Sequence, residues 1–233
     1  MTASINGDLT AHCAVDTSAM QWQASPSGTV WRKRVHLVGA AESGQVTSVV
    51  RYDSNSSFPE HGHPQGEEIL VLDGVFSDQQ GDWPAGTFLL NPEGFRHAPF
   101  SQSGCVLFVK LRQYPGLDRR HVAIDTKALE WQEGLVEGLA RKPLYSQESY
   151  SDSVELQKWE AGSDAGEIAY PDGAEIFVIE GSFHNERGSY SKGHWLRLPA
   201  GSTQHLQTEA GCTVYLKKAG LKYLVSETES AKQ

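Results

Sequence analysis

Cysteine is scarce in this chain of 233 residues, which carries three copies at Cys13, Cys105 and Cys212. No two of them form a C-x-x-C pair, and an odd number cannot pair completely. Small disulfide-stapled domains and zinc ribbons need paired, closely spaced cysteines. The sequence therefore indicates neither a disulfide framework nor a thiolate zinc site.

Basic side chains are also few, since 20 Lys and Arg stand against 29 Asp and Glu and give a formal net charge of −9. A nucleic-acid surface needs clustered Lys and Arg, so we expect no nucleic-acid partner. A solvated acidic surface is enough to account for the charge.

Long hydrophobic runs are missing as well. The longest, such as Ile176–Ile179, fall far short of the roughly 20 residues with which a helix spans a bilayer, so we expect no membrane partner. No Lys or Arg precedes Arg32 and the N-terminal region has no apolar stretch, which is unlike a signal peptide. We therefore expect a cytoplasmic location.

Amphipathic helical patterns are weak, with candidates only at Lys127–Leu139, which two glycines interrupt, and in the tail after Val225. From Val30 onward, β-rich runs alternate with turns that contain Gly or Pro. These runs are Val30–Val38, Gln45–Tyr52, Glu68–Phe76, Thr87–Asn91 and Cys105–Arg112. Many short strands separated by such turns predict an all-β sandwich or barrel.

An internal repeat organises the chain, because a shift of 107 residues matches the sequence to itself without a gap over about sixty positions. The segment from Glu68 to Gly74 overlays the segment from Glu175 to Gly181. The turn residues Gly86, Pro92 and Gly94 overlay Gly193, Pro199 and Gly201. We therefore expect two similar β domains in tandem, with a boundary near Gly116–Ala123.

Potential metal ligands lie in the first half between His61 and Gly74, where the chain reads H-x-H-x3-E-x6-G. His61 and His63 are two residues apart, so both imidazoles leave the same face of an extended strand. Glu67 joins them if strand pairing resumes in register after the Pro-Gln-Gly turn. Two neutral imidazoles and one carboxylate suit zinc or another divalent first-row metal.

A fourth ligand is expected from His97, which ends the segment G-x5-P-x-G-x2-H. The repeat supports this set of four by contrast. In the second half the four ligand positions hold residues that do not bind metals well, namely Ile168, Tyr170, Ala174 and Gln204. Because the Gly and Pro turn positions remain there, we expect one metal per chain, in the first half.

Neighbouring polar residues receive other roles. Glu68 corresponds to Glu175 in the half without ligands, so we interpret it as structural or solvated and Glu67 as the ligand. His205 lies one place beyond the ligand position and points to the opposite strand face. Cys105 corresponds to Cys212 and reads as a small core residue, with a place beside the metal as the alternative.

Together, the two segments resemble the paired motifs of cupins, which lie on neighbouring strands of a small β-barrel and converge on one metal. The spacing of the four ligands is most similar to that in the cupin domain of ChrR-type anti-sigma factors. Ser101 replaces the Asn that cupins carry four residues after the last histidine. The resemblance implies a bicupin, built from two double-stranded β-helix (jelly-roll) barrels.

The expected domains are therefore a polar N-terminal arm over residues 1–20, a metal-binding cupin domain over 21–118, and a second cupin domain without ligands over 119–233. The resemblance further implies a regulatory, stress-sensing module with zinc as the first choice of metal. The first thirty residues offer no H-x3-C-x2-C and no helical zinc domain, so we do not expect sigma-factor binding.

Two alternatives stay open. Cupins with three His and one Glu also resemble metal-dependent dioxygenases and isomerases, which use Fe(II), Mn(II) or Ni(II) and act on small molecules. A metal-stabilised interaction protein without turnover is the other alternative. The candidate partners are a small-molecule ligand at the first barrel and a second copy of the chain. The sequence assigns no catalytic residue and shows no motif for an organic cofactor.

Overall fold

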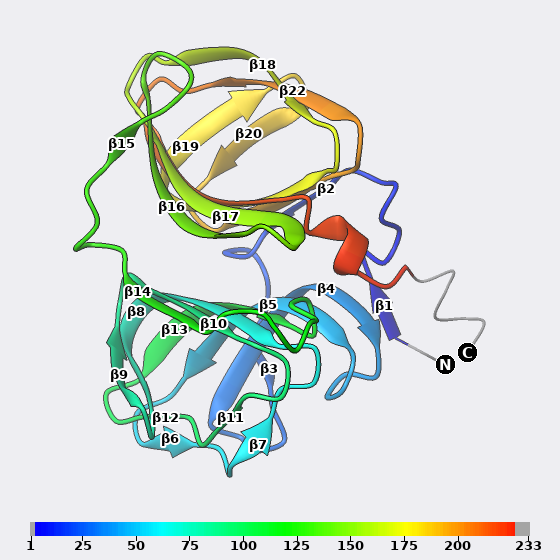
Figure 1. Cartoon of the computed structure of the whole chain (residues 1–233), viewed down its shortest axis with the longest axis vertical. Helices are drawn as coiled ribbons and strands as arrows, with labels where there is room; N and C mark the ends of the chain where they lie inside the picture. Colours follow the sequence, from blue (N-terminus) through cyan, green and yellow to red (C-terminus); the bar gives the residue numbers. More distant parts are fainter. Residues whose placement is uncertain (1–2, 227–233) are drawn as a thin grey trace. The chain divides into compact units, whose positions relative to one another are not determined.

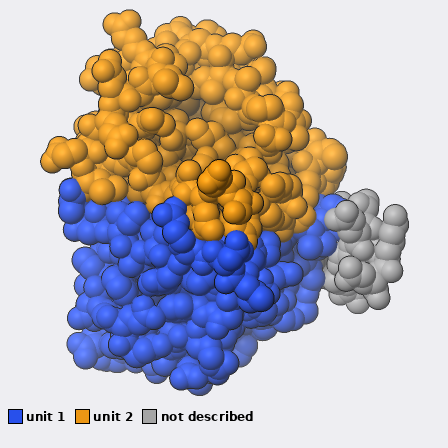
Figure 2. Space-filling view, in the orientation of Figure 1, with its two compact units in different colours: residues 1–7, 20–128, 225–233 blue, residues 8–19, 129–224 orange. Residues whose placement is uncertain are grey.

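A computed structural model describes residues 3–226, which form strands and a single three-residue 3-10 helix, η1 (Leu221–Tyr223) (Figure 1). These residues divide into two compact units, coloured separately in Figure 2. Unit 1 comprises residues 3–7, 20–128 and 225–226, and unit 2 comprises residues 8–19 and 129–224. The predicted all-β class is confirmed.

The strands of unit 1 include both long sheet strands and two-residue pieces that shape its rim. They are β1 (Ala3–Ile5), β3 (Gln23–Ala24), β4 (Val30–Gly39), β5 (Gln45–Tyr52), β6 (Ser56–Ser57), β7 (His61–Gly62), β8 (Glu67–Asp78), β9 (Gly81–Pro84), β10 (Thr87–Asn91), β11 (Arg96–His97), β12 (Phe100–Ser101), β13 (Cys105–Leu111) and β14 (Val122–Asp125). The main sheet runs in the order β1-β4-β5-β13-β8-β10-β14, and β7 pairs separately with β11.

The strands of unit 2 repeat this plan. They are β2 (Cys13–Asp16), β15 (Gln132–Glu133), β16 (Leu139–Gln147), β17 (Tyr150–Trp159), β18 (Asp164–Tyr170), β19 (Ala174–Asn185), β20 (Gly188–Ser191), β21 (His194–Leu198), β22 (Ser202–Gln207) and β23 (Cys212–Lys218). The main path runs β15-β16-β17-β23-β19-β21-β2, and β18 pairs with β22.

The predicted repeat is present in the strands themselves. β8, β9, β10 and β13 correspond residue for residue to β19, β20, β21 and β23 at the spacing of 107. Gly74 and Gly181 both have a φ of +70°, and a Cβ at either would collide with the carbonyl of the facing Gly104 or Gly211. Each unit is therefore one double-stranded β-helix, which we call the first barrel (unit 1) and the second barrel (unit 2).

Alternating side chains fill the barrel interiors. In the first barrel Cys105, Leu107 and Val109 follow every second position of β13 and enter the core. In the second barrel Cys212, Val214, and Leu216 do the same along β23. The alternation of side chains that the sequence predicts along these strands is therefore present in the structure.

The boundaries of the two units differ from those of the expected domains, because of how the edge strands pair. β14 pairs with β10, so the first barrel continues past residue 118 to residue 128. Residues expected to form a polar arm contribute two strands. β1 pairs with β4 in the first barrel, and β2 pairs with β21 in the second.

The helix expected at Lys127–Leu139 is absent, because residues 129–139 form turns and the short strand β15. The expected tail helix lies outside the described residues apart from Val225 and Ser226. Over residues 3–226, no helix has the length and apolar character to cross a membrane.

Candidate metal centre

The short strand pair β7–β11 places two of the predicted ligands opposite each other at one end of the first barrel (Figure 1). His61 on β7 faces His97 on β11 in the antiparallel register. His63 follows β7 directly, and its N–H donates to the Phe95 carbonyl at 2.9 Å. Main-chain pairing thus holds all three histidines on one rim.

A tight turn then returns the chain to the barrel wall. Gln65 and Gly66 adopt φ values of +60° and +72°, and the Gly66 N–H donates to the His63 carbonyl at 3.1 Å. A Cβ at Gly66 would lie 2.7 Å from the Tyr114 carbonyl oxygen, so glycine is needed here. The turn lets Glu67 begin β8 on the histidine side.

The imidazole groups converge. The ligand atoms of His61, His63 and His97 all lie within 4.8 Å of one another. The Nε2 atoms of His63 and His97 are 2.9 Å apart, and Glu67 Oε2 is 3.5 Å from each of them. An ion about 2.1 Å from its ligands can bridge atoms up to roughly 4.2 Å apart, so the distances among His63, His97 and Glu67 suit a shared ion.

Hydrogen bonds fix which ring nitrogens face the centre. His61 Nδ1 donates to the Pro59 carbonyl at 2.9 Å, and His97 Nδ1 donates to Asp78 Oδ2 at 3.1 Å. A carbonyl and a carboxylate only accept, so each Nδ1 carries the proton. The Nε2 lone pairs of both rings are left to point at a metal.

Asp78 is a functional residue that the sequence reasoning missed. It ends β8 with its side chain buried, and its other oxygen accepts hydrogen bonds from the Gln80 N–H at 2.9 Å and from Trp83 Nε1 at 3.3 Å. Burial by itself raises the pKa of Asp78, but the bonds from His97, Gln80 and Trp83 outweigh it and lower that pKa. The carboxylate stays charged and orients His97. One signal was available, since the 107-residue shift turns Asp78 into Asn185.

Glu67 and Glu68 point to opposite faces of β8, as the parity argument predicts. Asn91 Nδ2 donates to Glu67 Oε2 at 2.9 Å and holds the carboxylate toward the histidines. Glu68 is 2 % exposed and is paired in register with Lys110 of β13. Glu68 is therefore structural, and the solvated alternative is excluded.

Burial and aromatic rings surround two of the histidines. His63 and His97 are buried, and the phenyl rings of Phe76 and Phe95 meet His97 edge-on at 6.1 and 5.5 Å. Burial lowers the pKa of His63, Glu67 opposes this shift, and the positive charge of Arg112 adds to it. A neutral imidazole is the form that binds metal.

A cavity of about 410 Å³ opens beside this centre inside the first barrel. His61, His63 and Glu67 form part of its wall. The rest is mostly apolar and comes from the barrel strands, including Val30, Val46, Val50, Ile69, Leu107 and Val109. The volume falls in the range of small-molecule sites, so the centre can meet a ligand.

The corresponding place in the second barrel holds a neutral hydrogen-bond chain. Asn185 Nδ2 donates to Gln204 Oε1 at 3.1 Å, and Gln204 Nε2 donates to the Tyr170 hydroxyl at 3.0 Å. Within residues 3–226, the first-barrel histidines are the one group of this kind that could hold a metal. The three histidines thus form the candidate centre of the chain.

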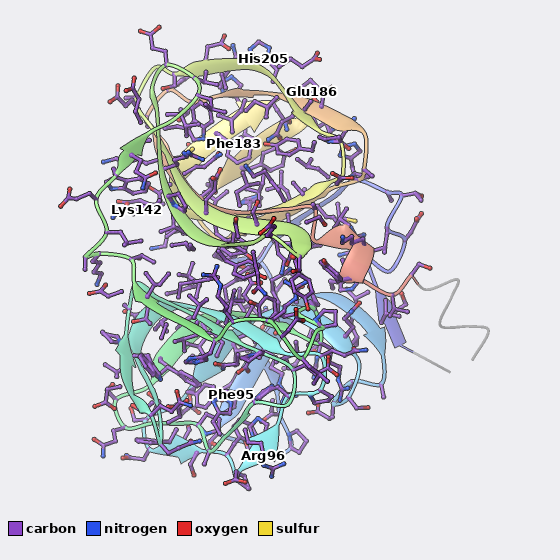
Figure 3. All side chains as sticks on the ribbon, in the orientation of Figure 1. Phe95, Arg96, Lys142, Phe183, Glu186 and His205 are labelled. Carbon is purple, nitrogen blue, oxygen red and sulfur yellow. The ribbon has the colours of Figure 1, made fainter. Side chains whose placement is uncertain are left out.

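Three other residues discussed from the sequence, Cys105, Ser101 and His205, lie away from the metal ligands or make structural hydrogen bonds. Cys105 lies in the core, where burial raises its pKa to about 11. Ser101 Oγ donates to the Val75 carbonyl at 2.6 Å, as Thr208 does to Ser182 in the second barrel. His205 is exposed at the edge of unit 2 near Glu186, and Arg96 is exposed at the edge of unit 1 (Figure 3).

Comparison with known families and structures agrees with the barrel and the centre. The family model described as ChrR Cupin-like domain matches residues 10–115 and again residues 119–222. Each match begins with an edge strand, β2 or β14, that the structure pairs in the other unit. No curated protein matches the sequence significantly.

Solved structures with the same fold are distant in sequence. A candidate dioxygenase from Nostoc punctiforme has a TM-score of 0.72 at 17% identity, covering 89% of this chain and 82% of that one. The pirin YhhW from Escherichia coli, solved with nickel(II), has a TM-score of 0.63 at 16% identity, covering 89% and 98%. Oxalate decarboxylase OxdC from Bacillus subtilis, as a deletion mutant, has a TM-score of 0.63 at 12% identity, covering 88% and 76%. At these identities the likeness concerns the fold.

Proposed function

Because the chain belongs to the family of ChrR cupin-like domains, we propose that it is a regulatory module whose first barrel binds one divalent metal. His61, His63, His97 and Glu67 would hold the ion, and Asp78 and Asn91 would orient two of these ligands. The observation that carries the proposal is the convergence of the imidazoles, with the Nε2 atoms of His63 and His97 2.9 Å apart.

The donor set suits zinc first. Three neutral imidazoles and one carboxylate complete a tetrahedral zinc site, which leaves no open position and fits a structural or sensing role. The second barrel fits the same role, because it keeps the fold and has lost every ligand. A stable scaffold with a single metal centre is what a module that reports a signal requires.

The cavity beside the centre favours a second candidate function, a metal-dependent dioxygenase or isomerase for small molecules. Six-coordinate Fe(II), Mn(II) or Ni(II) bound by the same four residues would keep two positions open toward that cavity. A bound metal would supply positive charge to a substrate oxygen there. The chain's own apolar walls would orient the substrate and exclude water.

Elemental analysis of protein purified without added metal tests the metal proposal. We expect one ion per chain in the wild type and in Glu68→Gln, and a clear loss in Glu67→Gln, which removes an anionic ligand at nearly constant size. Equal loss in both variants, or two specifically bound ions per chain, would contradict the assignment.

Cobalt(II) substitution separates the two functions. A four-coordinate visible spectrum that does not change when small ligands are added supports the sensing module. A six-coordinate spectrum that changes on addition of azide supports the enzyme, because azide needs an exchangeable position. The same protein sample serves both measurements.

A further inference from the structure

Arg112 is a cation at the cavity of the first barrel with no counter-ion. It lines the cavity together with Leu111 and Gly66. Over the described residues, its guanidinium takes part in no hydrogen bond or ion pair. An arginine that is half-buried without a partner is costly unless something neutralises it. The cavity therefore contains an unused site for an anion.

The Arg112 main chain is held firmly, so its side chain leaves from a fixed point. Its φ is +61°, its N–H donates to the Gly66 carbonyl at 2.9 Å, and its carbonyl accepts from Gln45 Nε2 at 2.7 Å. Ala219 occupies the same position of the second barrel with a φ of +55° and the same bond to Gly173. The two barrels thus share this backbone conformation, but only the first has a guanidinium at the position.

Two further arginines face the cavity from β4, and these are already paired. Arg32 Nη1 is 2.6 Å from Glu42 Oε2, and Arg34 Nη2 is 3.1 Å from Glu42 Oε1. Both arginines and Glu42 are among the residues that line the cavity. One carboxylate therefore serves two guanidinium groups and is not available to Arg112.

The second barrel supplies its own carboxylate at the matching place. Glu155 pairs in register with Leu216 and replaces Ser48, which pairs with Val109 in the first barrel. Glu155 is buried and accepts from Gln157 Nε2 at 2.7 Å, with Arg141 and Lys218 at 3.7 and 3.4 Å. An internal acid thus neutralises the cations of the barrel that has no metal.

We propose that the first barrel binds a small organic acid, whose carboxylate pairs with Arg112 while its apolar body lies among Val50, Ile69 and Leu107. This inference rests on the proposed function, because the acid lies in the cavity that the metal centre helps to form. It names the chemical class of the ligand: an amphipathic monocarboxylate. The carboxylate of the acid would neutralise Arg112 in the first barrel, as the Glu155 carboxylate neutralises Arg141 and Lys218 in the second.

Calorimetric titration of metal-loaded protein with octanoate tests the proposal, and 1-octanol serves as the uncharged probe of similar shape. We expect octanoate to bind the wild type more tightly than octanol. Arg112→Ala should weaken octanoate about 10- to 100-fold, the range for losing a charged hydrogen bond, and leave octanol unchanged. Arg112→Lys should keep part of the octanoate affinity.

Ser48→Glu is a second, independent variant. It installs in the first barrel the carboxylate that the second barrel already has, and it should abolish octanoate binding even if Arg112→Ala fails to fold. Arg187→Gln is the control, because Arg187 pairs with Glu186 on the second barrel and neither residue lines the cavity. Octanoate affinity should not change in that variant.

The metal content of each sample separates this proposal from the proposed function. Full metal content with equal octanoate affinity in the wild type and Arg112→Ala would overturn the acid site alone. Octanoate binding that survives Arg112→Ala but disappears with a chelator would also overturn it, because the carboxylate would then sit on the metal. A wild type that takes up no metal would instead overturn the proposed function.

Discussion

His97 and Asp78 in the first barrel occupy the places of Gln204 and Asn185 in the second, and in each pair the two side chains are joined by a hydrogen bond of 3.1 Å. The first pair combines an imidazole with a carboxylate, and the second combines two neutral amides. The geometry has been kept while the charge has been removed. A position that orients a ligand thus becomes one that only satisfies buried polar atoms.

The barrel interiors differ in the same sense. In the first barrel Ser48 and Val50 leave a cavity with an unpaired guanidinium at its wall. In the second, Glu155 and Gln157 occupy the matching strand positions and bond to each other at 2.7 Å. One interior carries a bonded polar pair at this place, and the other has a cavity beside the candidate metal centre. The same barrel fold therefore accommodates either a cavity or a pair of polar side chains at this place.

The largest effect on metal binding is expected when His97 of the first barrel is replaced by glutamine, the residue at the matching position of the second barrel. His97→Gln removes an imidazole donor, so metal affinity should fall by more than about 100-fold. Metal at 100 times its Kd stabilises the fold by about 2.7 kcal/mol, and this stabilisation should vanish. Melting curves with and without chelator measure it.

The reciprocal change provides the control for that experiment. Gln204→His should create no site, because Ile168, Tyr170 and Ala174 remain beside it. A second bound ion in Gln204→His, or full metal content in His97→Gln, would show that the contrast between the barrels does not depend on these ligands.

A matched pair of isoleucines compares the two interiors. Ile176 and its counterpart Ile69 both belong to the core clusters of their barrels, but Ile69 also lines the cavity of the first barrel. Ile176→Ala should cost about 2–5 kcal/mol of unfolding free energy. Ile69→Ala should cost less, because a side chain beside a cavity has fewer packing contacts to lose. Urea titrations of both variants, without metal, give the two values; equal costs would mean that the first interior is packed as closely as the second.

Asp78→Asn tests the charge beneath the ligand. The amide keeps the size of the carboxylate but holds His97 less firmly and no longer raises its basicity, so metal affinity should fall about 10- to 100-fold. Competition with a chelator of known affinity measures this loss. Asn185→Asp in the second barrel is the control and should leave metal binding unchanged. An unchanged affinity in Asp78→Asn would assign the carboxylate a structural role.

Sequence reasoning reached the fold because its signals are local and repeated. The Gly and Pro turns at a spacing of 107, and the alternation along β13, depend on backbone geometry that the strands keep. It also predicted that His61, His63 and His97 come together, because H-x-H and the final histidine of the second motif carry fixed spacings. Glu67 followed from parity, once the turn through Gly66 restored the register.

Features that depend on three-dimensional packing could not be read in advance. Asp78 lies between the two motifs without belonging to either, and it reaches His97 only through the barrel closure. The cavity is lined by residues from several strands at once. The weak helical pattern at Lys127–Leu139 failed because propensity alone rarely maintains a short helix that contains two glycines. No local sequence pattern indicates that β2 pairs with β21 or that β14 pairs with β10.

The smallest effect concerns the exposed strand pair β18–β22 of the second barrel, which carries a polar cluster around Asp164. Asp164 accepts hydrogen bonds from the Gly166 N–H at 2.9 Å, from His205, and from Gln207 Nε2 at 2.7 Å. These bonds lower the pKa of Asp164 from 3.8 to about 2. Ser57 stands at this position in the first barrel.

The sign of the pH dependence follows from that lowered pKa. A carboxylate with a lower pKa in the folded state stabilises the fold above its unfolded pKa of 3.8, and this contribution is lost as the pH falls from about 4 to about 2. Asp164→Asn should therefore lower the melting temperature of the second barrel slightly at pH 7, and the difference from the wild type should disappear near pH 2. Because the group is exposed, added salt should also shrink the difference. Ser57→Ala in the first barrel is the control and should show no such pH dependence. A difference that persists below pH 2 would mean that the aspartate acts through its shape and hydrogen bonds rather than its charge.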